Sequence, residues 1–296
     1  MTDLAHRPRR SALYMPGANT RALGKAKTLA ADMLLLDMED AVAPDAKAEA
    51  RAAVCAAVSA GGYGPREVVI RINGLDTEWG RDDLEAAVAA GPDGVLAPKV
   101  IDGGDIDRLD DAMTRAGAPK TMALWVMIEM PKALLNIQHI AEAVGRTRLQ
   151  GFVLGTNDLT KELRARSTPD RAAFQYSLGA AVAAARAYDL IALDGVFNEI
   201  GNGDGLAAEC ANGRDLGFDG KTLIHPSQIE ACNRIFAPDP EDVSQAEAVI
   251  AAFKEPANAG KGVIKVNGKM TELLHLEEAR RLVAIQAAID AFEGAA

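Results

Sequence analysis

The chain has 296 residues, of which 49% are hydrophobic, so it can bury the core of a barrel-sized domain. Its formal net charge of −10 argues against nucleic acid as the main partner. The three cysteines have no metal-ligand spacing, and no apolar run resembles a signal peptide or is long enough to cross a bilayer. We therefore expect a cytoplasmic protein without a membrane partner.

Eight short apolar runs alternate with helical segments along most of the chain. The helical segments are rich in alanine, a strong helix former. This alternation is typical of a (β/α)8 TIM barrel, whereas the alternative, an open doubly wound sheet, would show a glycine-rich fingerprint after its first strand. The expected strands are 12–15, 33–36, 68–72, 94–97, 123–128, 151–154, 191–193 and 222–224. The expected helices are 20–31, 47–60, 81–90, 106–115, 131–145, 171–188 and 205–217.

The last sixty residues depart from the barrel pattern. Pro238 and Pro240 interrupt it, and Asn267-Gly268 after an apolar run predicts a small hairpin. We expect a barrel over residues 1–236 and a C-terminal extension over residues 237–296. The expected elements of the extension are a helix over 241–254, a strand over 263–266 and a helix over 276–292.

Two carboxylates follow neighbouring predicted strands. Glu129 closes the run 123–128, and Asp158 comes shortly after the run 151–154. Parallel strands joined by a helical crossover lie side by side or close to it, so their C-terminal ends point the same way. Mg²⁺ binds through one or two carboxylates and keeps positions for water and substrate. A metal site is therefore favoured over the alternative, in which each acid only caps the next helix.

Residues at the C-terminal ends of barrel strands line one mouth. Among them, Arg71 is costly to bury without a partner. It either pairs with the acids after the second strand or holds a substrate carboxylate or developing oxyanion. His225 precedes a proline and has no identifiable acid partner, which favours a structural role. The residues expected at the mouth are Asp37, Glu39, Asp40, Arg71, Lys99, Glu129, Asp158, Asp194 and His225.

The residues Gly155, Thr156 and Asn157 precede an expected helix start. Their backbone N–H groups could bind a carboxylate, as helix N-termini do. The compatible alternative is that Thr156 or Asn157 caps the helix.

Eight motifs in chain order resemble the HpcH/HpaI aldolase and citrate lyase β-subunit family. They are YMPGAN, LLLDMEDAVAPDAK, VIRINGLDTEWGRDDL, LAPKV, MIE, GTNDL, ALDGVF and GFDGKTLIHPSQI. Within that family, RINGLDTEWGRD and the later ARST look most similar to malyl-CoA lyases. The resemblance covers nearly the whole chain and depends on the ordered set, since no single motif would suffice.

The resemblance implies a metal site and a keto-acid site at the barrel mouth. Glu129 and Asp158 would ligate Mg²⁺, with Mn²⁺ as an alternative ion. Glu39 and Asp40 would order the water shell of the metal. Arg71 would polarise the carbonyl of an α-keto acid such as glyoxylate.

The resemblance also implies a coenzyme A site and a lid. The amides of Gly155–Asn157 would bind the carboxylate of the keto acid. Asn19 and Lys25 match positions near the phosphates of coenzyme A, and Lys99 lies at the edge of the pocket. The C-terminal extension resembles a lid that covers a neighbouring active site in a homotrimer or hexamer.

The implied reaction is a Mg²⁺-dependent carbon–carbon lyase reaction. A 3-hydroxyacyl-CoA such as malyl-CoA or citramalyl-CoA is cleaved to acetyl-CoA or another acyl-CoA and a keto acid, or formed from them. In malyl-CoA lyases an aspartate of the lid is the base, and the segment NGKMTELLHLEEA places Glu272 there instead. The longer side chain matters, because a misplacement of about 1 Å can cost on the order of a hundredfold in rate.

Three alternatives to the lyase are compatible with the sequence. One is a malyl-CoA thioesterase or malate-synthase-like enzyme. Another is a citryl-CoA lyase subunit that needs a larger complex. The last is an aldolase that acts on small keto acids without coenzyme A.

Overall fold

The computed structural model describes residues 7–295, which form two compact units. The larger unit is Arg9–Phe236, and the smaller one comprises residues 237–295 with Arg7 and Pro8. The larger unit contains the eight expected strands. They are β1 (Ser11–Pro16), β2 (Met33–Asp37), β3 (Glu67–Arg71), β4 (Gly94–Ala97), β5 (Ala123–Ile128), β6 (Leu149–Leu154), β7 (Ile191–Asp194) and β8 (Gly220–Leu223).

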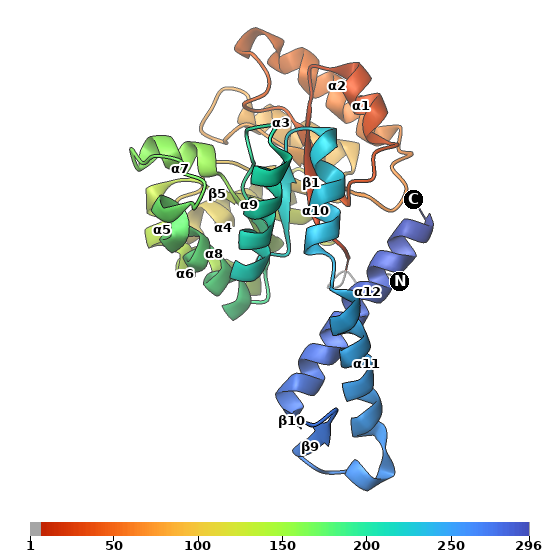
Figure 1. Cartoon of the computed structure of the whole chain (residues 1–296). Coiled ribbons are helices and arrows are strands. Elements are labelled where there is room, and N and C mark those ends of the chain that lie inside the picture. The colour runs from red at the N-terminus through yellow and green to blue at the C-terminus, as the bar shows by residue number, and fades with distance from the viewer. Residues whose placement is uncertain (1–6, 296) are drawn as a thin grey trace. The chain divides into compact units, whose positions relative to one another are not determined.

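The eight strands form a closed parallel barrel in chain order, so the predicted TIM-barrel fold is confirmed. Each strand pairs with the next one, and β1 closes the ring by pairing with β8 from Ser11 opposite Lys221. The helices lie around the strands in Figure 1. Because all strands run the same way, their C-terminal ends meet at one mouth.

The helices of the barrel mostly agree with the expected segments. The predicted helix 131–145 is broken at Asn136, whose backbone leaves helical geometry (φ −109°, ψ 12°) and whose Nδ2 donates to the Ile101 carbonyl at 3.0 Å. Helix α10 after the last strand was not predicted. The helices are α1 (Thr20–Ala26), α2 (Lys47–Ser59), α3 (Gly80–Ala90), α4 (Gly103–Arg115), α5 (Pro131–Leu135), α6 (Ile137–Glu142), α7 (Thr156–Glu162), α8 (Gln175–Ala187), α9 (Gly203–Leu216) and α10 (Ile229–Phe236).

Trp125 fills the interior of the barrel. It is fully buried and packs with the other inward-facing side chains of the strands. Two glycines on the flanking strands make room for its ring. A Cβ added at Gly151 would lie 2.6 Å from Trp125 Cζ3, and one added at Gly94 would lie 3.2 Å from Trp125 Cδ1. The interior is thus a packed core, and only the mouth above it is available for chemistry.

The smaller unit is built around two helices and a hairpin. The predicted hairpin is confirmed: Asn267 (φ 47°) and Gly268 (φ 82°) both have the positive φ that a tight type I′ turn requires. Buried apolar side chains of the helices and of β9, among them Val249 and Ile264, form a separate small core. The elements are α11 (Pro240–Lys254), β9 (Val263–Val266), β10 (Lys269–Glu272) and α12 (Leu273–Ala295).

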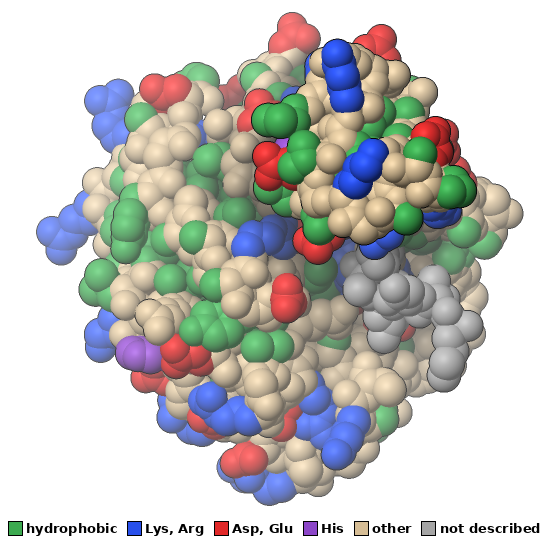
Figure 2. Space-filling view, turned by 90° about the horizontal axis from the view of Figure 1, so that it is seen from below, with side chains coloured by type: hydrophobic (Ala, Val, Ile, Leu, Met, Phe, Trp, Pro, Cys, Tyr) green, Lys and Arg blue, Asp and Glu red, His purple; other side chains and the backbone are tan. Residues whose placement is uncertain are grey.

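The surface carries both signs of charge. On the face shown in Figure 2, Lys and Arg side chains are interspersed with Asp, Glu and hydrophobic side chains. The net charge of −10 therefore does not produce a field of one sign over this face. None of the helices within residues 7–295 is long and apolar enough to cross a membrane.

Candidate active site at the mouth of the barrel

Arg71 ends β3 and points into the barrel, as does Asp37 at the end of the adjacent β2. The two residues are register partners, and the guanidinium makes a bidentate pair with the carboxylate: Nε to Oδ1 at 2.8 Å and Nη2 to Oδ2 at 2.6 Å. Nη1 of Arg71 lies 2.9 Å from Oε2 of Glu39. Burial would lower the pKa of Arg71, but Asp37 raises it well above its ordinary value, so the side chain stays charged. The ion-pair alternative for Arg71 is thus present in the structure.

The loop after β2 brings Glu39 and Asp40 to the same place. The Nζ of Lys99, which follows β4, lies 2.5 Å from Oε1 of Glu39 and 3.9 Å from Oδ1 of Asp40. Glu39 is buried, and burial raises its pKa against the opposing effects of Arg71 and Lys99. Asp40 is more than half exposed and lies 3.5 Å from Nη1 of Arg71. These four residues therefore form one charged cluster.

Glu129 follows β5 and lies beside the end of β6. It is 1% exposed, and its Oε1 accepts a hydrogen bond from the backbone N–H of Lys99 at 2.8 Å. A Cβ added at Gly155 would lie 2.5 Å from Oε2 of Glu129, so only glycine fits there. Burial, then Asp158, then Glu39 raise the pKa of Glu129 to about 8. The charges of Glu129 and Asp158 thus influence one another, and their convergence on one metal ion stays a prediction.

These residues fit a divalent cation. Burial, Asp158 and Glu39 disfavour the ionised form of Glu129, and a bound cation would offset that repulsion. Within residues 7–295, no three Asp, Glu, His or Cys side chains converge closely enough to enclose a metal by themselves. Mg²⁺ does not require such a cage, because it is held by one or two carboxylates and completes its shell with water and substrate oxygens.

The start of α7 is only partly available for a substrate. The backbone N–H of Gly155 donates to the Ile128 carbonyl at 3.1 Å, so the expectation that this amide binds a carboxylate is wrong. The N–H groups of Thr156 and Asn157 open the helix and have no acceptor within it. The side chain of Asn157 exchanges two hydrogen bonds with Asn198, at 2.7 and 3.3 Å, and caps nothing.

Asp194 and His225 do not belong to this cluster, contrary to prediction. Asp194 ends β7 on the outer face of the barrel, where it pairs with Lys221 of the adjacent β8 and with Arg171 of the segment before α8. Burial would raise the pKa of Asp194, but Lys221 and then Arg171 lower it. Nδ1 of His225 lies 2.7 Å from the Oγ of Ser227, at the exposed entrance to α10. Both residues thus support the barrel wall.

Lys47 was missed by sequence reasoning, although it shapes the site. Its buried Nζ donates to the carbonyls of Met38 at 3.0 Å and Glu39 at 2.7 Å and to Oδ1 of Asn73 at 2.8 Å. Asn73 Nδ2 in turn donates to the Met38 carbonyl at 2.9 Å. A signal was available: Lys47 is the first residue of α2, where the helix dipole disfavours a cation.

We expect Lys47→Met to lower the free energy of unfolding by about 2 kcal/mol, because buried carbonyls lose a charged donor. It should also weaken Mg²⁺ binding about tenfold, because the loop that carries Glu39 loosens. Chemical denaturation and calorimetric titration with Mg²⁺ measure the two effects. Lys120→Met, at an exposed turn, is the matched control and should change neither. Unchanged metal affinity in a destabilised Lys47 variant would contradict the positioning role.

The two residues expected near coenzyme A lie on α1. Asn19 caps this helix, with its Oδ1 accepting from the N–H of Ala22 at 3.0 Å, and Lys25 is exposed in the last turn. No hydrogen bond or ion pair of the described chain joins either residue to the carboxylate cluster.

Glu272 lies in the smaller unit, at the end of β10. Its backbone N–H donates to Nδ1 of His275 at 2.9 Å, and its side chain is partly exposed. Three large hydrophobic side chains near it in sequence are exposed: Met270 (73%), Leu273 (51%) and Leu274 (60%). The hairpin end of this unit thus combines a carboxylate with an apolar surface.

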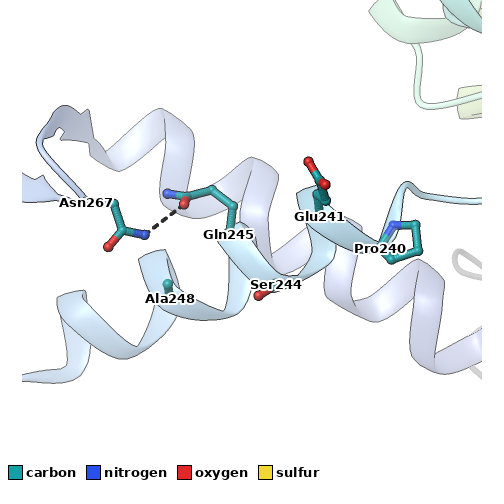
Figure 3. Close-up of a pocket in the computed structure, with 6 residues that line it drawn as sticks. All are labelled: Pro240, Glu241, Ser244, Gln245, Ala248 and Asn267. Carbon is teal, nitrogen blue, oxygen red and sulfur yellow. Dashed lines mark hydrogen bonds between the residues drawn. The ribbon is translucent and has the colours of Figure 1, made fainter.

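A surface hollow of about 380 Å³ also lies in the smaller unit (Figure 3). Its wall is formed by α11 and by Asn267, whose Nδ2 donates to Oε1 of Gln245 at 2.9 Å. Glu241 is its one ionisable residue, so it lacks the paired carboxylates and cations found at the barrel mouth. The chemistry therefore assigns the candidate site to the mouth.

Comparisons with known proteins agree with this geometry. Residues 10–226 match the HpcH/HpaI aldolase/citrate lyase family. The chain is 47% identical over 292 residues to a (3S)-malyl-CoA thioesterase of Cereibacter sphaeroides, with 99% of each chain covered. It is 35% identical over 284 residues to citrate lyase subunit beta of Leuconostoc mesenteroides subsp. cremoris, covering 94% of this chain and 93% of the relative. It also resembles CitE of Mycobacterium tuberculosis in complex with magnesium, acetoacetate and coenzyme A, with a TM-score of 0.76, 27% identity and coverage of 96% and 100%.

Proposed function

Because the chain belongs to the HpcH/HpaI aldolase/citrate lyase family, we propose that it is a Mg²⁺-dependent enzyme that hydrolyses the thioester of malyl-CoA or a close 3-hydroxyacyl-CoA. The observation that carries this proposal is the end-to-end similarity to a (3S)-malyl-CoA thioesterase, at 47% identity over 99% of both chains. That similarity includes the C-terminal extension with Glu272. The carboxylate cluster at the barrel mouth supports the metal requirement.

In this proposal Glu129 and Asp158 hold the metal, and Glu39 and Asp40 order its water shell. When bound, Mg²⁺ would act as a Lewis acid that stabilises negative charge on a substrate oxygen. The raised pKa of Glu129, caused by burial and then by Asp158 and Glu39, supports the need for a cation between these groups. Mn²⁺ is expected to substitute, since it takes the same oxygen ligands.

Arg71 binds and orients the substrate. Its Nε and Nη2 are fixed by Asp37, and its Nη1 faces Glu39. Movement of Glu39 toward the water shell would release Nη1 to a substrate oxygen. The amides of Thr156 and Asn157 receive the free carboxylate of the acyl group.

Coenzyme A is bound by residues of helix α1 and of the loop after β4. Asn19 and Lys25 on α1 bind its phosphates, and Lys99 lies at the pocket edge. Their support is the resemblance of the motifs and the CitE complex that contains coenzyme A. Lys99 would have to exchange Glu39 for the ligand, which its exposed side chain permits.

The hairpin end of the smaller unit acts as a lid on the site of another copy of the chain. Exposed Met270, Leu273 and Leu274 supply an apolar surface for that contact, and Glu272 supplies a base. Heterologous contacts of this kind form a ring when the rotation between copies closes, and the family resemblance supports a homotrimer or hexamer.

In the hydrolysis step, Glu272 takes a proton from water while the water oxygen attacks the thioester carbonyl. The carbon–sulfur bond then breaks, the thiolate of coenzyme A leaves and takes a proton, and the free hydroxy acid remains. Arg71 stabilises the charge that develops on the acyl group. Glutamate is one methylene longer than the aspartate that the resemblance to malyl-CoA lyases implies, so its carboxylate takes a different position relative to the substrate.

Carbon–carbon cleavage is the second candidate, favoured by the family membership and by the site residues shared with that chemistry. There the base takes the proton of the 3-hydroxyl group, the carbon–carbon bond breaks, and the enolate of acetyl-CoA leaves from glyoxylate. The electron pair of the broken bond forms the enolate, which is then protonated on carbon.

One assay separates these reactions. The purified protein is incubated with (3S)-malyl-CoA and Mg²⁺, and mass spectrometry follows all coenzyme A species while glyoxylate is trapped as its hydrazone. Hydrolysis is expected to give free coenzyme A and malate without glyoxylate. Formation of acetyl-CoA and glyoxylate in equal amounts would contradict the thioesterase proposal and support the lyase. Failure to turn over or retain any coenzyme A thioester would overturn both and favour a subunit that needs partners or a CoA-independent aldolase.

A further inference from the structure

Tyr14 carries a polar group with no role in the site described above. It lies on β1, two residues after inward-facing Ala12, and packs against the side chains of the barrel interior. Its ring centroid is 4.8 Å from Cζ of Arg71, a cation–π distance. Tyr14 therefore belongs to the floor of the mouth, directly against the arginine of the charged cluster.

The hydroxyl oxygen of Tyr14 is buried and has no hydrogen-bond partner within residues 7–295. Native proteins satisfy nearly all buried polar groups, so an unsatisfied one requires an explanation, and a water or ligand at a functional site is one such explanation. Burial is the largest cause that raises the pKa of Tyr14, with Asp37, Glu129 and Glu39 adding to it against Arg71. The phenol thus keeps its proton and can donate a hydrogen bond at any ordinary pH.

The neighbouring cation does not offer an equivalent donor. Nε and Nη2 of Arg71 are occupied by Asp37, and Nη1 lies against Glu39. Beside the backbone N–H groups of Thr156 and Asn157, Tyr14 therefore supplies a neutral side-chain donor whose hydrogen is not engaged by a protein group of the described chain. Its partner must be an acceptor, such as a carbonyl or carboxylate oxygen.

Tyr63 shows what distinguishes Tyr14. Its hydroxyl is also buried without a partner within residues 7–295, and burial raises its pKa. Tyr63, however, lies in the loop after α2, and its ring is 5.1 Å from Nζ of Lys27. No carboxylate contributes to the shift of its pKa. An orphaned hydroxyl alone does not indicate a ligand. The combination of an orphaned hydroxyl with the arginine and carboxylates of the mouth does.

We propose that Tyr14 is a substrate-binding residue whose hydroxyl donates a hydrogen bond to a carbonyl or carboxylate oxygen of the bound keto acid or 3-hydroxyacyl group. This inference rests on the proposed function, because it takes the mouth of the barrel to be the site of an oxygen-rich acid. It adds a neutral side-chain donor to the charged groups and backbone amides already assigned.

Tyr14→Phe tests the proposal, because it removes only the hydroxyl and keeps the ring against Arg71. Calorimetric titration with glyoxylate in the presence of saturating Mg²⁺ measures binding without turnover. We expect affinity for glyoxylate to fall about tenfold, which is the net value of one well-placed hydrogen bond. The unfolding temperature of the free protein should not fall, because no protein partner is lost. Tyr63→Phe is the matched control and should leave glyoxylate binding unchanged.

The outcomes distinguish a failure of the Tyr14 proposal from a failure of the proposed function. Binding to the parent and equal binding to Tyr14→Phe would overturn the role of Tyr14 and leave the proposed function intact. A lower unfolding temperature with unchanged binding would also overturn it, since a structural hydroxyl behaves that way. No binding of glyoxylate to the parent would overturn the proposed contact of Tyr14 with a keto acid, whereas the proposed hydrolysis, which releases malate and not glyoxylate, is decided by its own assay with (3S)-malyl-CoA. Tyr14→Leu should weaken binding further than Tyr14→Phe, because Arg71 then loses the ring beside it.

Discussion

Glu129→Gln is expected to weaken Mg²⁺ binding by at least about a hundredfold and to lower turnover of a coenzyme A thioester by about a thousandfold. The amide keeps the shape of the side chain and can still accept from the N–H of Lys99, which donates to Glu129 at 2.8 Å. It cannot supply the negative charge that the metal needs. Titration calorimetry with Mg²⁺ and steady-state kinetics measure the two losses.

The same variant should be no less stable than the parent when no metal is present. Glu129 is 1% exposed and has a pKa of about 8, raised by burial and then by Asp158 and Glu39, so its ionised form opposes folding. A neutral isostere removes that opposition. Thermal unfolding in the presence of a chelator measures this effect.

Glu85→Gln is the matched control, because Glu85 is an exposed residue in the middle of α3. It should leave metal binding, turnover and stability unchanged. Metal affinity and turnover equal to the parent in Glu129→Gln would show that the carboxylate is not a ligand. A loss of activity that only accompanies unfolding would point to a packing role instead.

Gly220→Ala is expected to destabilise the barrel by about 3 kcal/mol or more, the upper range of overpacking. A Cβ at this position would overlap the carbonyl oxygen of Arg9, and it would lie 2.7 Å from the carbonyl oxygen of Arg10. Both obstacles are backbone atoms, which cannot turn away as a side chain can. They belong to the seam where β8 pairs with β1 and closes the ring.

Gly179→Ala is the matched control within the same unit. Gly179 lies inside α8, and nothing is within 4 Å of an added Cβ, so alanine should stabilise the helix by about 0.8 kcal/mol. Chemical denaturation of the two variants should therefore move the midpoint in opposite directions. A Gly220→Ala protein as stable as the parent would mean that the seam can widen, which the closed pairing argues against.

The fold could be predicted because the hydrophobic pattern, the helix-forming residues and the turn residues all indicated the same elements. Apolar runs of three to six residues alternated with alanine-rich helices, and most of the runs were followed by polar residues. The positive φ angles of Asn267 and Gly268 follow from their residue types, so the hairpin was also predictable. The differences were the missed helix α10 and local boundaries, as at Asn136, where a side-chain hydrogen bond to the Ile101 carbonyl accompanies a break in the helix.

The composition of the site could be predicted only in part. Glu129, Arg71 and Glu39 were found because charged residues at strand ends are unusual in buried strands. Asp194 satisfied the same rule and yet lies on the outer face of the barrel, where Lys221 of the adjacent β8 pairs with it at 3.0 Å. Strands of a parallel barrel are buried on both faces, so their hydrophobic pattern does not distinguish inward from outward residues. A shift of one residue exchanges the two faces.

The sequence by itself therefore determined the barrel, the hairpin and the types of charged group at the strand ends, because these depend on local pattern and residue chemistry. Only the tertiary structure decided which of those groups meet. It paired Arg71 with Asp37, placed Lys47 under the loop of Glu39, and left the hydroxyl of Tyr14 without a protein partner in the described chain. Contacts between residues far apart in the chain depend on the direction of each side chain in the closed ring, which no local pattern records.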